Sequence, residues 1–185
     1  MKYLEAKVES QAPTSKDVVL LDGFFILHLI KEVPQTFGKI STKILQIVTN
    51  FGSNRMDIVF DRYFSPSIKN YKRDLRNNTD IPYNISGPDQ SRPHDFTKEL
   101  RNNYFKEALV KFLIEDWASD KKAPFIGDKV IHLNFNLCYR FESSGNQVKR
   151  TIDDDFTCED HEEADTKIIF HLSKYKILPR WHNSQ

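Results

Sequence analysis

The acidic residues are the part of this sequence best suited to chemistry. The segment from Asp153 to Asp165 is rich in Asp and Glu and contains no Lys or Arg. Hard divalent cations such as Mg²⁺ bind carboxylate oxygens and keep several waters, so a few carboxylates from different elements suffice to hold one. A simpler interpretation is a helix start, with Asp160 at the N-cap and Glu163 three residues later, which needs no metal. Taken alone, the segment favours this capping interpretation.

Asp22 and Asp61 strengthen the case for a cation, because each follows a short apolar run that reads as a strand. An Asp at a strand end commonly forms a turn with the next backbone amides, so either residue alone indicates little. Two such strand ends together with an acidic helix start predict a carboxylate cluster whose repulsion a cation would relieve. A bound ion would lower the pKa of a water and stabilise charge on a phosphate under attack. The combination therefore predicts phosphodiester hydrolysis.

A basic segment between residues 67 and 76 is suited to nucleic acid. Its positive side chains recur at spacings of three, four and seven, which places them on one face of a helix: Lys69, Lys72, Arg73 and Arg76. Such a face could contact a phosphate backbone, or it could simply be a solvated helix face. Other chemistries lack their motifs, because the His residues have no zinc-binding spacing and neither serine-nucleophile motifs nor glycine-rich phosphate loops occur.

The elements that must position these residues alternate between strand and helix. The pattern predicts a strand over 17–22, a helix over 41–48 and a strand over 55–61. That order favours a parallel pair joined by a right-handed crossover, which sets Asp22 and Asp61 at the sheet edge where open α/β sheets bind ligands. The rest of the chain predicts a long loop, a helix capped by Asp95, three strands and a last helix, at 77–93, 95–117, 129–134, 137–141, 147–152 and 161–174.

The composition indicates one folded, intracellular domain. The 185 residues are 39% hydrophobic, enough for a core, and the net charge of +1 means that any nucleic-acid binding must come from local patches. The first residues are charged, and the longest apolar stretch, 18–30, is shorter than a membrane helix of about 20 residues, so we expect neither export nor membrane insertion. Two Cys without a CxxC pair favour a reducing compartment, either nuclear or cytoplasmic.

Three segments together resemble PIN-like nucleases. They are Leu20-Leu21-Asp22-Gly23, then Ile58-Val59-Phe60-Asp61 followed by Ile68-Lys69 and Arg73, and last His161-Glu162-Glu163-Ala164-Asp165-Thr166-Lys167-Ile168. The similarity runs from about Asp17 to Leu172. It is closest to the flap-endonuclease and asteroid branch and to animal proteins that carry the HEEADT motif, which is its most specific part.

The resemblance implies an α/β, three-layer PIN-like fold with a mainly parallel central sheet flanked by helices. It also implies a Mg²⁺ or Mn²⁺ site that cuts nucleic acid, with these catalytic and metal-binding residues: Asp22, Asp61, Glu163 and Asp165. Glu162 is a further metal ligand in this scheme, because Glu162 and Asp165, three residues apart, share a helix face more easily than Glu163 and Asp165 do.

The end of the sequence departs from the family pattern. In the family, another strand with an Asp-rich motif follows the last helix, whereas Tyr175 to Arg180 supplies no carboxylate. We therefore expect a PIN-like domain over 17–174, incomplete at its C-terminus, between an N-terminal extension over 1–16 and a tail over 175–185. The first functional interpretation is a metal-dependent nuclease. The alternative is a non-catalytic PIN-like scaffold that binds nucleic acid or protein, and a more distant one is a structural α/β domain with no ligand.

Overall fold

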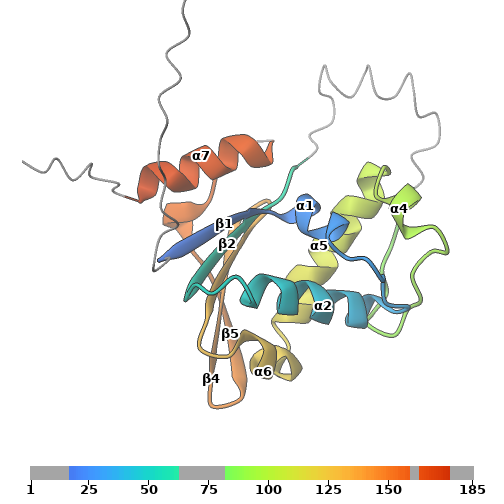
Figure 1. Ribbon diagram of the computed structural model, residues 1–185, viewed down its shortest axis with the longest axis horizontal. Helices are drawn as coiled ribbons and strands as arrows, with labels where there is room; N and C mark the ends of the chain where they lie inside the picture. Colours follow the sequence, from blue (N-terminus) through green and yellow to red (C-terminus); the bar gives the residue numbers. More distant parts are fainter. Residues whose placement is uncertain (1–16, 63–81, 159–162, 176–185) are drawn as a thin grey trace, which may run out of the picture.

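The computed structural model describes residues 17–62, 82–158 and 163–175. They form an α/β fold around one five-stranded open sheet with the strand order β1-β2-β3-β4-β5 (Figure 1). The strands are β1 (Val18–Asp22), β2 (Arg55–Val59), β3 (Val130–Asn134), β4 (Cys138–Ser144) and β5 (Gln147–Ile152). The α/β class and all five predicted strands are confirmed. The segment predicted to be a basic helix lies outside the described residues, with Lys69, Lys72, Arg73 and Arg76.

The sheet is mixed rather than mainly parallel. β1, β2 and β3 pair in parallel, as expected for the first two, whereas β3, β4 and β5 pair antiparallel. The connections explain the change, because two short turns cannot carry a crossover between parallel strands. The β4–β5 turn consists of Gly145 and Asn146, whose φ angles of 57° and 65° are those of a tight hairpin turn.

The main difference between the predicted and the observed helices is a break in the predicted helix over 95–117. The 95–117 segment is two helices, α4 (Phe96–Glu99) and α5 (Asn103–Trp117), rather than one. Asp95 caps α4 as expected, but the Asn102 side chain accepts hydrogen bonds from the backbone of Tyr104 and Phe105 and starts a second helix. The other helices are α1 (Gly23–His28), α2 (Phe37–Thr49), α6 (Ala123–Ile126) and α7 (Ala164–Lys174), with 3₁₀ turns η1 (Asp120–Lys122) and η2 (Asp154–Phe156).

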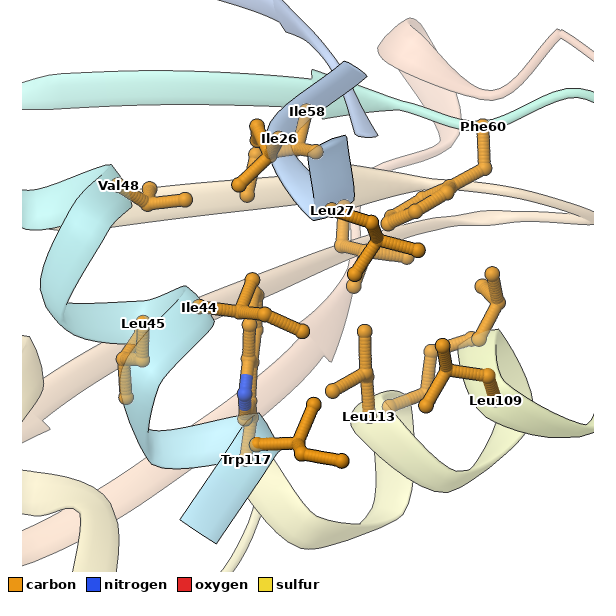
Figure 2. Close-up of a cluster of buried hydrophobic side chains, with 14 of the residues drawn as sticks. Ile26, Leu27, Ile44, Leu45, Val48, Ile58, Phe60, Leu109, Leu113 and Trp117 are labelled. Atoms are coloured by element: carbon orange, nitrogen blue, oxygen red, sulfur yellow. The ribbon is translucent and has the colours of Figure 1, made fainter. Parts of the chain in front are cut away.

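One face of the sheet forms the hydrophobic core. Alternate residues of the central strands, including Ile58 and Leu133, point into a cluster built with α1, α2 and α5. Figure 2 shows Trp117 of α5 among the aliphatic side chains of α2 in this cluster. Its indole nitrogen donates a hydrogen bond of 3.0 Å to the Ser41 hydroxyl, which satisfies the one polar group of this buried ring.

The opposite face of the sheet is polar and is covered by α7. Asp57 of β2 and the pair His132 and Asn134 of β3 occupy the alternate positions, and all three are buried. Helix α7, red in Figure 1, contacts β1, β2 and η2 on the side of the sheet away from α2, α5 and α6. The sheet therefore separates an apolar layer from a buried polar layer. In the described part of the chain, no helix has both the length and the apolar character needed to cross a membrane.

Candidate functional site

The predicted carboxylates lie at the ends of β1 and β2 and at the start of α7. In the parallel register Asp22 is opposite Val59, two residues before Asp61. The absence of a side chain at Gly23 lets the ring of Phe60 pack against the end of β1, because a Cβ atom at position 23 would lie 2.3 Å from that ring. The sheet edge expected to carry Asp22 and Asp61 is therefore present.

Both Asp residues also act as helix caps. Oδ1 of Asp22 accepts hydrogen bonds from the backbone N–H groups of Phe24 at 2.8 Å and Phe25 at 3.1 Å, which caps α1. Oδ1 of Asp61 accepts a 2.7 Å hydrogen bond from the backbone N–H of Ala164, the first residue of α7. This long-range bond joins the end of β2 to the acidic HEEADT segment.

The predicted capping pair of Asp160 and Glu163 is wrong in its position along the helix. Glu163 is the N-cap residue of α7 rather than its third residue, and its own side chain makes no capping bond. The carboxylate of Asp61 takes that role because the fold brings β2 against this helix start. Glu163 and Asp165 are both exposed. Asp160 and Glu162 lie outside the described residues.

The described carboxylates do not form a closed metal site. Within residues 17–62, 82–158 and 163–175, no group of three or more His, Cys, Asp or Glu side chains is placed to hold a metal ion. Cys138 and Cys158 are both buried and free.

Beneath α7 lies a polar cluster centred on Asp57, which is fully buried. Its carboxylate accepts hydrogen bonds from Arg55 Nε at 2.8 Å, His171 Nδ1 at 2.7 Å and the hydroxyl of Tyr175, and Nδ1 of His132 lies 3.4 Å from it. Burial alone would raise the pKa of Asp57, but these donors outweigh it and hold the pKa well below its ordinary value. Asp57 is therefore a buried anion held by four side chains.

The two histidines of the cluster extend it in opposite directions. Nε2 of His132 lies 3.0 Å from a carboxylate oxygen of Asp153. His171 donates from Nδ1 to Asp57, and its Nε2 lies 3.2 Å from the amide nitrogen of Asn134, which is a donor. The contact between Nε2 of His171 and the Asn134 side chain therefore links α7 to β3 as well as to β2. The cluster thus holds α7 against β2 and β3 through buried polar side chains.

Lys167 is a buried lysine of α7. Its ammonium group donates hydrogen bonds to the backbone carbonyls of Phe60 at 2.8 Å and Phe135 at 2.6 Å. Burial lowers the pKa of Lys167 to about 8. Lys167 therefore joins α7 to the residues that directly follow β2 and β3, next to Asp61.

Sequence reasoning missed the Asp57 cluster, although a local signal for it exists. Each of two otherwise apolar strands carries two polar residues at a spacing of two, Arg55 and Asp57 in β2 and His132 and Asn134 in β3. This period of two indicates a polar face on a buried sheet. The pairing with His171 could not be read in this way, because it joins positions 114 residues apart.

We predict that Lys167→Met removes a rise in stability at alkaline pH. Because the folded-state pKa of Lys167 is about 8 against an ordinary 10.5, the unfolded chain holds more protons between these values. The free energy of unfolding contributed by Lys167 should therefore increase by about 2 kcal/mol from pH 8 to pH 10. Urea unfolding of both proteins at these pH values measures the difference. As a control, Lys111→Met changes an exposed lysine, and its unfolding free energy should change with pH as that of the wild type does. The same pH dependence in Lys167→Met and the wild type would contradict the prediction.

Comparison with protein-family models, curated proteins and solved structures gives no match for this chain.

Proposed function

We propose that this chain is a PIN-like domain that binds Mg²⁺ or Mn²⁺ at the C-terminal edge of β1 and β2 and hydrolyses phosphodiester bonds of nucleic acid. The observation that carries the proposal is the hydrogen bond from Ala164 N–H to Asp61, which joins the end of β2 to the start of α7. The register of β1 and β2 also supports it, because it puts Asp22 at the same strand ends as Asp61. The proposed ligands are Asp22, Asp61, Glu163 and Asp165, the last two at the start of α7.

The chemistry of these donors fits a hard cation. Carboxylate oxygens are the ligands that Mg²⁺ prefers, and both hydrogen bonds given above for Asp22 use Oδ1, so its Oδ2 is not engaged in capping α1. Since the described residues supply no closed set of three ligands, water must complete the coordination, as is common for Mg²⁺. When bound, the ion would supply a water of lowered pKa and stabilise charge on the phosphate.

The residues of the chain would contribute positioning. The cap bonds of Asp22 and Asp61 fix the orientation of each carboxylate, because Oδ1 of Asp22 accepts from Phe24 and Phe25 and Oδ1 of Asp61 accepts from Ala164. Lys167 holds the end of β2 against α7 through the carbonyl of Phe60. These contacts keep the edge rigid, which favours a defined geometry at a reacting phosphate.

A non-catalytic scaffold that binds nucleic acid or protein is the second candidate, and a specific observation favours it. Asp22 and Asp61 already have structural roles as helix caps, and the buried ammonium of Lys167 lies close enough to Asp61 to interact with its charge. Part of the negative charge at this edge is therefore balanced without a divalent ion. Such an edge would keep the fold while losing catalysis.

We predict that Mg²⁺ or Mn²⁺ raises the melting temperature of the wild type and that Asp22→Asn combined with Asp61→Asn abolishes the rise. At an ion concentration ten times Kd, binding adds about 1.4 kcal/mol, which corresponds to about 3 to 6 °C for a chain of this size. Asn is the informative replacement, because its side-chain oxygen preserves a helix cap while the charge is lost. Differential scanning fluorimetry with and without each ion measures the shift.

The matched control is Asp95→Asn, the same change at the cap of α4, which should retain the full metal-dependent shift. No shift in the wild type would exclude the metal site. Incubating the same proteins with labelled DNA and RNA oligonucleotides then separates the two candidates. Metal-dependent cleavage that is lost in the double variant supports the nuclease, whereas a metal-dependent shift without cleavage supports the scaffold.

A further inference from the structure

The two edge strands of the sheet are protected to very different degrees. At one edge, β5 carries Lys149 and Arg150, and the carboxylate of Asp120 accepts a hydrogen bond of 2.9 Å from the backbone N–H of Val148. Charged residues and covered N–H groups of this kind prevent an edge strand from pairing with another chain. The β5 edge is therefore closed to strand addition.

At the other edge, β1 has none of these protections. It reads Val-Val-Leu-Leu-Asp, every residue is half-buried, and within the described residues it pairs with β2 alone. An aliphatic edge strand without Lys, Arg or Pro is a template for one more strand, and among the described residues no strand pairs with the outward side of β1. The inner charges that would discourage pairing are absent from Val18–Leu21.

Helix α7, which contacts β1, has an apolar stripe beside its buried face. The residues that α7 buries are Ala164, Lys167 and His171, whereas the side chains of Ile169 and Leu172 are 66% and 41% exposed. With Ile168 they recur at spacings of one, three and four, so they lie on one side of the helix. A helix that buries Lys and His while exposing Ile and Leu has an apolar stripe left for another partner.

We propose that the β1 edge and the α7 stripe of Ile168, Ile169 and Leu172 form a docking surface for an extended segment of a partner protein. The segment would add to β1 as a sixth strand, with backbone hydrogen bonds supplying affinity and aliphatic side chains packing against the α7 stripe. This surface does not depend on a metal and goes beyond the proposed nuclease or scaffold function.

The charges at the two ends of β1 indicate which kind of partner segment would bind there. Asp17 and Asp22 stand at the two ends of β1, so a strand whose aliphatic centre is flanked by Lys or Arg on both sides complements it. A second copy of the same chain is a poor occupant. Antiparallel pairing of two β1 strands with Leu20 opposite Val19 would place Asp22 of one copy opposite Asp17 of the other, and like charges across strands are destabilising.

The test uses the full chain and a fluorescent, end-capped peptide of sequence Lys-Val-Ile-Val-Ile-Lys, with binding followed by fluorescence anisotropy. Two peptide controls probe the mode of binding. One carries N-methyl groups on alternate amides, which removes the N–H donors needed for strand addition, and the other replaces both Lys residues with Glu. We expect the first peptide to bind and both controls to bind at least tenfold more weakly.

Two sets of protein variants locate the surface. Ile169→Glu with Leu172→Glu should weaken binding at least tenfold while leaving the circular dichroism spectrum unchanged, because both side chains are exposed. Asp17→Lys should weaken binding of the Lys-flanked peptide and strengthen binding of the Glu-flanked peptide. Ile152→Glu is the matched control, an exposed apolar residue on the protected β5 edge, and should bind like the wild type.

Several results would overturn the proposal. No binding of the Lys-flanked peptide, equal binding of the N-methylated peptide, or full binding by the α7 double variant each exclude a strand added at β1. Sedimentation of the wild type as a dimer that the α7 double variant dissociates would assign the surface to a second copy instead of a partner. None of these results depends on metal or cleavage, so the proposed function is tested separately.

Discussion

Replacing Asp57 with Asn is expected to lower the free energy of unfolding by about 3 to 5 kcal/mol, the range found when one partner of a buried ion pair is removed. Asn keeps the shape of the side chain, so no cavity contributes. Arg55, His171 and Tyr175 all donate hydrogen bonds to the Asp57 carboxylate. The side-chain NH₂ group of Asn would therefore face a donor where a carboxylate oxygen now accepts a hydrogen bond. The guanidinium of Arg55 would also lose its buried counter-charge.

Urea unfolding at pH 7 measures this change. Asp128→Asn is the matched control, because its side chain is 86% exposed and should shift stability by no more than about 0.5 kcal/mol. A loss below about 1 kcal/mol for Asp57→Asn would show that the cluster is not a buried anion held by its neighbours.

The same pair of proteins should respond differently to acid. The pKa of Asp57 is lowered in the folded state, so its contribution to stability is complete above the ordinary value of 3.8 and is lost as the pH falls toward the folded value. The stability gap between wild type and Asp57→Asn should therefore be constant from pH 5 to 7 and narrow below about pH 4. A gap that stays constant into acid would contradict the assignment of the charge to Asp57.

Phe60→Ala is the second change expected to have a large effect, at about 3 to 5 kcal/mol. The ring is almost completely buried and packs edge-on against Phe24 at 5.1 Å between centroids. It also fills the space that Gly23 leaves open between the ends of β1 and β2. Removing the ring would therefore create a cavity in the core at the ends of β1 and β2, the edge proposed to bind the cation.

A double-mutant cycle shows whether this contact holds the edge together. Gly23→Ala alone should cost about 1 to 3 kcal/mol, because the new Cβ would lie 2.3 Å from the ring of Phe60. In the Phe60→Ala background that clash is gone, so Gly23→Ala should add little. Urea unfolding of the four proteins measures the coupling energy. Strictly additive losses of unfolding free energy would show that the residue at position 23 does not clash with the ring of Phe60.

The elements that sequence periodicity could predict are those whose cause is local. Apolar runs bounded by turn residues predicted all five strands, and helical spacing predicted α2 and the last helix. The break between α4 and α5 escaped this reasoning, because the apolar stripe continues through it while one side chain, Asn102, captures the backbone amides. The periodicity of the strands also did not predict that β3, β4 and β5 pair antiparallel, because strand direction depends on the connections between strands.

The site divides in the same way. By itself the sequence determined that Asp22 and Asp61 follow two strands joined by a helical connection, and chain order then favours a parallel pair that carries both at one edge. Only the tertiary structure decided that Asp61 caps α7, more than 100 residues away, and that Asp57 is the centre of a buried polar cluster. The physical reason is that a buried charge is stable only with partners, and its partners here come from elements distant in the chain.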